Sequence, residues 1–224
     1  MSFNVAIDGP AGAGKSTIAK QVARKEGFIY VDTGAMYRAM AYYLLQQGID
    51  GNDSGAISRA CTNAEISLRY ENGEQVVLLN GENVNGVIRT EQVSRMASVS
   101  SANPDVRVRL VELQKKLAKV NDVVMDGRDI GTCVLPDADV KIFLTASAAV
   151  RAKRRYLELH EKGETADLAT IEADIIERDH RDMTREHSPL KQAEDAKLLD
   201  SSDMTIEQVV DAIIARIEQA KKER

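Results

Sequence analysis

The run GPAGAGKS, residues 9–16, limits the fold of this chain more than any other feature of its sequence. It follows a short apolar run at residues 3–8 and precedes a helical pattern with one apolar face at residues 16–25. The order of strand, glycine loop and helix is typical of the first unit of a parallel α/β sheet. The sequence therefore predicts an α/β fold that begins with such a unit.

The same run matches the spacing G-x-x-x-x-G-K-[ST] of a P-loop at every fixed position. Small residues let backbone N–H groups surround phosphate oxygens, and the N-terminus of the following helix adds positive potential. Lys15 is expected to reach the β- and γ-phosphates of a nucleotide, and the Ser16 hydroxyl to ligate Mg²⁺. A chance glycine-rich turn is disfavoured by the strand before it, the helix after it and the Lys-Ser pair. The predicted nucleotide-binding residues are Gly9, Pro10, Ala11, Gly12, Ala13, Gly14, Lys15, Ser16 and Thr17.

Hydrophobic patterning along the chain predicts a doubly wound parallel sheet flanked by helices. Further strands are expected at residues 28–31, 123–125, 140–146 and 197–200, and helices at 35–47, 103–120, 147–162, 167–186 and 205–222. Residues 64–85 differ, because two short β-type runs flank Asn72-Gly73, a strong hairpin signal. We therefore expect a P-loop core at 1–49 and 101–224, with a short helical lid at about 147–164. A small antiparallel β insert is expected at 50–100.

Composition narrows the class of partner. The net charge of −5 argues against a general nucleic-acid binder, so anion binding must come from local placement of Arg and Lys. No apolar run approaches the roughly 20 residues that span a bilayer, and the N-terminus lacks the pattern of a signal peptide. Cys61 and Cys133 have no metal or disulfide spacing, which suits a reducing compartment. We expect a cytoplasmic monomer that acts on small molecules, without nucleic-acid or membrane partners.

Two further motifs carry charge next to predicted strand ends. In DTGAMYRAM, Arg38 lies one turn into an apolar helix, where packing does not explain it, whereas Tyr37 is expected to be core. In VVMDGRDIGT, Asp126 ends an apolar strand, where an acid can hold Mg²⁺ or its water shell. The alternative for the second motif is a charged turn. With no guanine-binding Asn-Lys-x-Asp signature and a short chain, these motifs favour a kinase for a small anionic acceptor.

Taken together, several ordered motifs make the chain resemble the bacterial cytidylate kinase family along essentially its whole length. They are GPAGAGKST, DTGAMYR, GVIRTEQVS, MDGRDIGT, VKIFLTAS and ERDHRD. The resemblance implies direct in-line transfer of the γ-phosphoryl of ATP to CMP or dCMP, with Mg²⁺ as cofactor, in pyrimidine nucleotide metabolism. Two alternatives stay open: a broader pyrimidine monophosphate kinase, and a nucleotide-binding sensor that no longer transfers phosphate.

The resemblance also implies roles for particular residues. It assigns the monophosphate to Arg38, Arg128 and Arg185, the base to Ser98, Arg107 and Asp129, and the ribose to Arg178 and Asp182. Thr33 stands where relatives also have serine, so the hydroxyl is kept at that substrate-binding position. The expected metal ligands are Ser16 and Asp126, and the expected catalytic residues are Lys15, Arg128, Arg185, Arg151 and Arg155. Cytosine carries an amino donor where uracil has a carbonyl, so a carboxylate such as Asp129 favours cytosine.

Two charged stretches allow both a structural and a functional interpretation. The run at 151–155 is most often a solvated helix face, but the resemblance favours a lid whose Arg151 and Arg155 close on the transferring phosphoryl group. In ERDHRDMTRE, residues 177–186, arginines and acids repeat at spacings of three and four, as surface ion pairs do. The resemblance divides this stretch into a ligand-facing set and a supporting set.

Overall fold

The computed structural model describes residues 2–224, which form two compact units. Unit 1 comprises Ser2 and Ile29–Asn121, and unit 2 comprises Phe3–Phe28 and Asp122–Arg224. Across residues 2–224, no helix combines the length and the apolar character needed to cross a membrane. The predicted domain division, with an insert at 50–100, stays a prediction.

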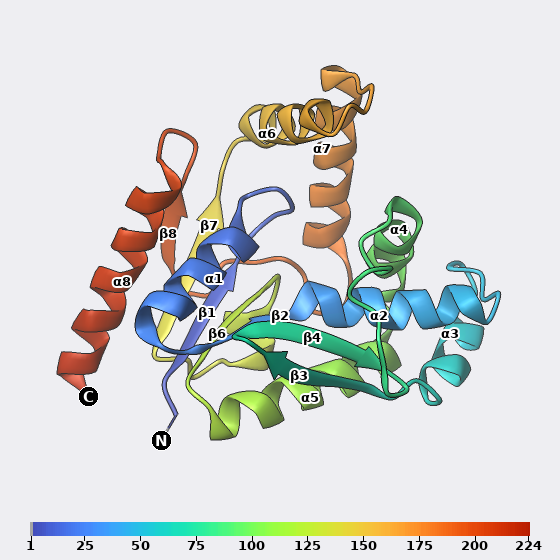
Figure 1. Ribbon diagram of the computed structural model, residues 1–224, viewed down its shortest axis with the longest axis horizontal. Helices are drawn as coiled ribbons and strands as arrows, with labels where there is room; N and C mark the ends of the chain where they lie inside the picture. The colour runs from blue at the N-terminus through green and yellow to red at the C-terminus, as the bar shows by residue number, and fades with distance from the viewer. Residues whose placement is uncertain (1) are drawn as a thin grey trace. The chain divides into compact units, whose positions relative to one another are not determined.

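Unit 2 contains a parallel sheet, as the sequence predicts (Figure 1). Its strands are β1 (Asn4–Asp8), β6 (Val123–Gly127), β7 (Val140–Thr145) and β8 (Lys197–Asp200). Strand β1 pairs with β6 on one side and β7 on the other, and β7 pairs with β8. Strand β6 is buried along its whole length, as expected for an apolar strand inside a parallel sheet. All four strands end on the same side, so Asp8, Gly127 and Thr145 share one edge of the sheet.

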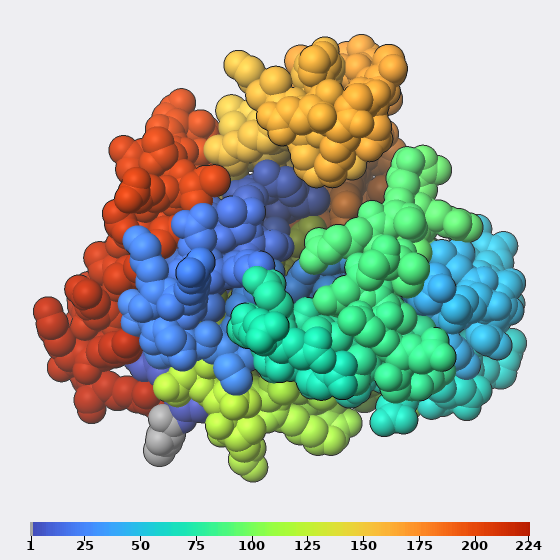
Figure 2. All heavy atoms as spheres, in the orientation of Figure 1, coloured from blue at the N-terminus to red at the C-terminus, as the bar shows by residue number. Residues whose placement is uncertain are grey.

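Helices of unit 2 follow the predicted apolar periodicity. They are α1 (Lys15–Glu26), α6 (Ala148–Glu161), α7 (Leu168–Thr184) and α8 (Ile206–Glu223), with one π-helical turn η1 at Ile130–Val134. Helix α8 packs against α1 and β7 through a fully buried stripe that includes Val209, Ile213 and Ile217. Helices α6 and α7 pack against each other, and their atoms form one continuous block in Figure 2. Both begin with side-chain caps, from Ser147 and Asp167 respectively.

The end of α7 differs from the sequence prediction. The helix stops at Thr184 rather than continuing to 186, and Arg185 has extended backbone angles of φ −61° and ψ 142°. Pro189 disfavours helical geometry in the residue before it, Ser188, so the helix does not continue through this turn. The chain turns back there, and the Leu190 N–H donates to the Asp182 carbonyl at 2.8 Å. Arg185 therefore leaves the helical arginine stripe on which the sequence pattern placed it.

Unit 1 combines a small antiparallel sheet with helices. Its elements are β2 (Ile29–Asp32), α2 (Thr33–Gln46), α3 (Ser54–Cys61), β3 (Ile66–Glu71), β4 (Glu74–Leu79), β5 (Glu82–Asn83), α4 (Glu91–Ser100) and α5 (Pro104–Val120). The β3–β4 hairpin turns at Asn72 and Gly73, whose φ values are 52° and 79°, so the hairpin prediction is confirmed. The hydrophobic pattern did not predict α3 and α4. Their signals were the capping residues Asp53 and Thr90, which each accept a backbone hydrogen bond.

Gly9 provides a test of how strictly the glycine loop is built. Its φ is +150°, and a Cβ there would lie 1.9 Å from the Leu144 carbonyl oxygen of β7. We expect Gly9→Ala to lower the free energy of unfolding by about 3 kcal/mol or more, because β7 cannot move away without losing its pairing with β1. Urea denaturation of the purified variant measures this loss.

Gly27→Ala is the matched control in the same unit. Gly27 caps α1 at φ +73°, and no heavy atom lies within 4 Å of a Cβ built there. Only the backbone strain remains, so we expect a loss of about 1 kcal/mol. Equal losses in the two variants would contradict the steric argument.

Candidate functional site

The glycine loop places Lys15 at the first position of α1. Gly9, Gly12 and Gly14 all have positive φ, and Gly14 is the N-cap of the helix. The Lys15 side chain is buried, and its Nζ donates to the Pro10 carbonyl at 2.7 Å. Burial, and secondarily the charge of Arg128, lowers the pKa of Lys15 to about 7. A cation shielded from water in this way gains most from an anion that enters the loop.

Ser16 and Asp126 join the loop to the end of β6. The Ser16 hydroxyl donates to Asp126 Oδ2 at 3.0 Å; the carboxylate is buried, whereas Ser16 is exposed. A hydroxyl and a carboxylate oxygen are hard ligands of the kind that Mg²⁺ takes beside phosphate and water, so the pair fits this ion. Within residues 2–224, no group of three or more His, Cys, Asp or Glu side chains is arranged to hold a metal.

Asp8 is a buried carboxylate that the sequence motifs did not identify as a candidate site residue. It ends β1 immediately before Gly9 and accepts hydrogen bonds from the backbone N–H groups of Ile130 and Gly131, at 2.8 and 2.7 Å. These bonds hold the turn η1 that follows Arg128 and Asp129 in the chain. Its signal was an acid at the end of an apolar strand, the same signal that identified Asp126.

Arg128 and Asp182, two predicted acceptor-binding residues of unit 2, form an ion pair. Arg128 Nε donates to Asp182 Oδ2 at 2.9 Å, so the turn after β6 is bound to α7. Burial acts to raise the pKa of Asp182, but the charge and hydrogen bond of Arg128, with the charges of Arg178 and Arg185, lower it overall. Asp182 is therefore bound to Arg128, and the charges of two further predicted arginines stabilise its carboxylate form.

Asp129 and Arg185 lie close to each other in the same unit. Arg185 Nη2 is 3.7 Å from Asp129 Oδ1, and both side chains are almost completely buried. Arg185 Nε also donates to the Ser188 carbonyl at 2.7 Å, across the turn that ends α7. The extended backbone at Arg185 makes this contact with Ser188 possible, which helix periodicity could not have indicated.

The two predicted lid arginines differ in environment. Arg151 is buried and donates to Ala146 and Ala11 carbonyls at 2.8 and 2.9 Å, and to both oxygens of Asp179. Arg155 is exposed and pairs with Glu158 at 3.0 Å. Arg151 thus ties α6 to the glycine loop and to α7, whereas Arg155 lies on a solvated helix face.

In unit 1, Asp32 organises the start of α2. It is the N-cap of α2 and accepts from the Ala35 N–H at 2.8 Å. Its Oδ2 also accepts from Arg38 Nη2 at 3.1 Å. Thr33, the first residue of the helix, is buried. The motif DTGAMYR is therefore a capped helix start that carries a paired arginine.

The predicted base-reading residues of unit 1 are partly enclosed. The Arg107 guanidinium lies over the Tyr37 ring, with 5.7 Å between Cζ and the ring centroid, and donates to the Ser101 carbonyl at 3.3 Å. Ser98 is half-buried on α4. Tyr37 is half-buried rather than part of the buried core that the sequence led us to expect, and its ring lies under the Arg107 guanidinium.

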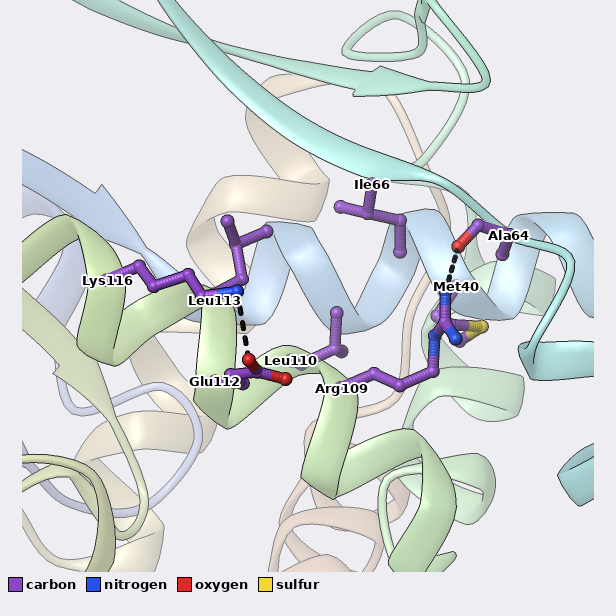
Figure 3. Close-up of a pocket in the computed structure, with 8 residues that line it drawn as sticks. All are labelled: Met40, Ala64, Ile66, Arg109, Leu110, Glu112, Leu113 and Lys116. Carbon is purple, nitrogen blue, oxygen red and sulfur yellow. Dashed lines mark hydrogen bonds and ion pairs between the residues drawn. The ribbon is translucent and has the colours of Figure 1, made fainter.

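Unit 1 also contains a cavity of about 240 Å³, and other residues line it (Figure 3). It is lined by Met40, Ala64, Ile66, Arg109, Leu110, Glu112, Leu113 and Lys116. Arg109 points to the Ala64 carbonyl, to which it donates at 3.1 Å, and Lys116 pairs with Glu112 at 2.9 Å. None of the predicted site residues lines this cavity, so it is not the predicted nucleotide site.

Comparison with known proteins gives consistent matches over nearly the whole chain. A family model described as cytidylate kinase matches residues 5–219. A cytidylate kinase of Caldicellulosiruptor saccharolyticus is 52% identical over 212 residues, which cover 95% of this chain and 94% of that protein. A cytidylate kinase of Shouchella clausii is 47% identical over 221 residues, which cover 99% of this chain and 98% of that protein.

Solved structures match the fold at low sequence identity. A gluconokinase from Sinorhizobium meliloti 1021 has a TM-score of 0.51 at 12% identity, covering 98% of this chain and 94% of that one. A shikimate kinase from Bacteroides thetaiotaomicron has a TM-score of 0.50 at 14% identity, covering 96% and 98%. These likenesses, together with the parallel sheet, confirm the predicted α/β fold.

The burial of Asp8 generates a prediction about pH. Burial raises the pKa of Asp8 from 3.8 to about 6, against the opposing effect of its two backbone hydrogen bonds. Because the folded-state pKa lies above the unfolded one, the favourable contribution is present below about pH 4 and is lost as pH rises to about 6. Relative to Asp8→Asn, wild type should lose about 2.5 kcal/mol of unfolding free energy between pH 4 and pH 7.5.

Urea denaturation at several pH values measures this difference. Asp137→Asn, which neutralises an exposed acid before β7, is the control and should follow the wild-type pH profile. Parallel profiles for wild type and Asp8→Asn would overturn the argument. An overall stability offset for Asp8→Asn is expected, because its amide has only one acceptor for two N–H groups.

Proposed function

The chain belongs to the cytidylate kinase family, and we propose that it transfers the γ-phosphoryl group of ATP directly to CMP or dCMP. The products are CDP or dCDP and ADP, and the chain is an ATP-dependent nucleoside monophosphate kinase. The observation that carries the proposal is the buried Lys15 beside the Ser16–Asp126 pair, in a chain that belongs to this family along almost all of its length.

On the donor side, we propose that residues 9–17 bind the ATP phosphates. Positive-φ glycines bring backbone N–H groups close to a bound anion, and Gly9 leaves no room for a side chain. The Lys15 side chain is buried, and its Nζ donates to an uncharged acceptor, the Pro10 carbonyl. Phosphate oxygens would offer Lys15 charged acceptors, which favour its protonated form. This effect opposes burial, which lowers the pKa of Lys15.

Mg²⁺ is the proposed cofactor, with Ser16 and Asp126 as the residues that would hold it. Bound there, the ion would neutralise charge on the ATP phosphates during transfer. The Ser16 hydroxyl oxygen and an Asp126 carboxylate oxygen share a hydrogen bond. Both are hard oxygen atoms of the kind that Mg²⁺ takes as ligands.

On the acceptor side, we propose the roles that the family resemblance implies. Arg38, Arg128 and Arg185 bind the monophosphate, Ser98, Arg107 and Asp129 read the cytosine, and Arg178 and Asp182 bind the ribose, with Thr33 supplying a further hydroxyl. Burial of Asp129 and Arg107 supports base reading, because an enclosed polar group is left unpaired by the wrong base. The Arg128–Asp182 bond supports a fixed position for the phosphate-binding guanidinium.

We propose that transfer needs no general base. The phosphate of CMP is already ionised at neutral pH, so its oxygen can attack the γ-phosphoryl group in line. The chain then contributes alignment and positive charge, from Lys15, Arg128 and Arg185, with Arg151 and Arg155 from the lid. In this structure Arg151 is bound to Asp179, and this pair competes with any contact between Arg151 and the phosphoryl group. The proposed partners are small molecules only, and the proposed state is a monomer.

Turnover with a panel of acceptors tests the proposal. With ATP and Mg²⁺, we expect CDP formation from CMP, and dCDP from dCMP, to exceed turnover of UMP and AMP by at least tenfold in kcat/KM. Removal of Mg²⁺ with a chelator should abolish turnover. Equal rates with all pyrimidine monophosphates would instead favour a broader pyrimidine kinase. ATP binding without any transfer would favour a nucleotide sensor.

Asp129 tests the assignment of base recognition. We expect Asp129→Ala to lower kcat/KM for CMP by about 100-fold and to leave the KM for ATP within a few-fold of wild type, because a buried acceptor for the cytosine amino group is lost. Steady-state kinetics at saturating ATP and then at saturating CMP separates the two effects. Asp137→Ala is the control on an exposed acid. A matching loss for ATP would contradict the assignment.

A further inference from the structure

Asp32 binds two arginines, of which the family resemblance assigns only one. Its Oδ2 accepts from Arg38 Nη2 at 3.1 Å and from Arg89 Nη2 at 3.2 Å. The two guanidinium groups therefore converge on a single oxygen, within unit 1. Two positive charges against one negative charge leave a net positive charge at the start of α2, where the helix dipole is also positive.

The backbone of Asp32 is held from outside its own helix. The Gln75 side chain accepts from the Asp32 N–H at 2.9 Å and donates to the Asp32 carbonyl at 3.2 Å, so both of its polar atoms are used. Asn85 in turn donates to the Gln75 carbonyl at 2.8 Å. These bonds join β4 and the segment after β5 to the start of α2, and they fix the carboxylate on which both arginines depend.

Arg89 differs from Arg38 in burial. The Arg89 side chain is 68% exposed, against 21% for Arg38 and 7% for Asp32. Its neighbours are anchored, because Ile88 is buried and Thr90 caps α4. The backbone at Arg89 is thus fixed while most of the side chain faces solvent. An exposed ion pair contributes little to stability, so the pair with Asp32 does not by itself explain an arginine at this position.

Arg38 retains donor capacity beside this pair. Its Nη2 is bound to Asp32, but among residues 2–224 its buried Nε has no hydrogen-bond acceptor. A buried donor without an acceptor is costly unless a ligand supplies one. Gly34 lies beside this guanidinium, because a Cβ built on it would be 3.1 Å from Arg38 Nη1. As a glycine it has no side chain that could cover Arg38.

We propose that Arg89 is a second guanidinium for the phosphate of the acceptor nucleotide, with Asp32 as the positioning residue that holds Arg38 and Arg89 together. This inference rests on the proposed function, since it adds a residue to the acceptor site that contains Arg38. A phosphate has enough terminal oxygens to accept from both arginines, whereas the shared Asp32 oxygen must serve both donors at once. Arg89 therefore gains a stronger acceptor when the phosphate is present.

The test compares the binding of CMP with that of cytidine, which lacks the phosphate, by isothermal titration calorimetry on the full chain. We expect Arg89→Ala to weaken CMP binding about tenfold or more and to leave cytidine binding within twofold, because one charge-assisted contact to phosphate is lost. Arg89→Lys keeps a point charge and should retain an intermediate CMP affinity. In turnover, Arg89→Ala should raise the KM for CMP more than it lowers kcat.

Arg95→Ala is the matched control, because Arg95 is an exposed arginine of the neighbouring helix α4 that pairs with Glu91. It should leave CMP and cytidine binding unchanged, and both variants should unfold at nearly the wild-type temperature. CMP binding by Arg89→Ala within twofold of wild type, or an equal loss for CMP and cytidine, would overturn the inference. Wild-type binding of CMP without CDP formation would refute the proposed transfer but not the role of Arg89 in binding.

Discussion

The close approach of Gly9 to the Leu144 carbonyl is the constraint on which unit 2 depends. At a separation that excludes any side chain, the chain leaves β1 directly over the neighbouring strand β7 and turns into α1. That turn puts Lys15 at the first helical position, and Ser16 next to the end of β6. The positions of Lys15 and Ser16, which we propose bind the phosphoryl donor, thus follow from a backbone contact that only glycine permits.

Charge in unit 2 is arranged by burial as much as by pairing. Asp8 and Lys15 both have pKa values displaced toward their neutral forms, since each is enclosed by the loop and the turn that follows β6. Asp182 is displaced the other way, because Arg128 is bound to it directly. Phosphate binding would add negative charge where the chain has concentrated buried cations, which is the electrostatic basis of the proposed activity.

Unit 1 shows how residues outside the proposed acceptor site can hold the residues of that site in place. Gln75, on a hairpin, forms two hydrogen bonds to the backbone of Asp32 and so sets the carboxylate that orients Arg38. Tyr37 similarly lies under Arg107. If the proposed site is correct, substitution of such supporting residues would alter recognition without removing any ligand contact.

The sequence by itself determined the glycine loop, the parallel α/β class, the hairpin at Asn72-Gly73 and the family. Local spacing sufficed for these, because turn chemistry and hydrophobic period act over a few residues. Only the tertiary structure decided that Asp8 holds the turn after β6, that Arg185 lies beyond its helix, and that Arg89 shares a carboxylate with Arg38. The contacts of Asp8 and Arg89 join residues that are far apart in the chain, and the position of Arg185 depends on the turn after α7. A periodic sequence pattern predicts neither.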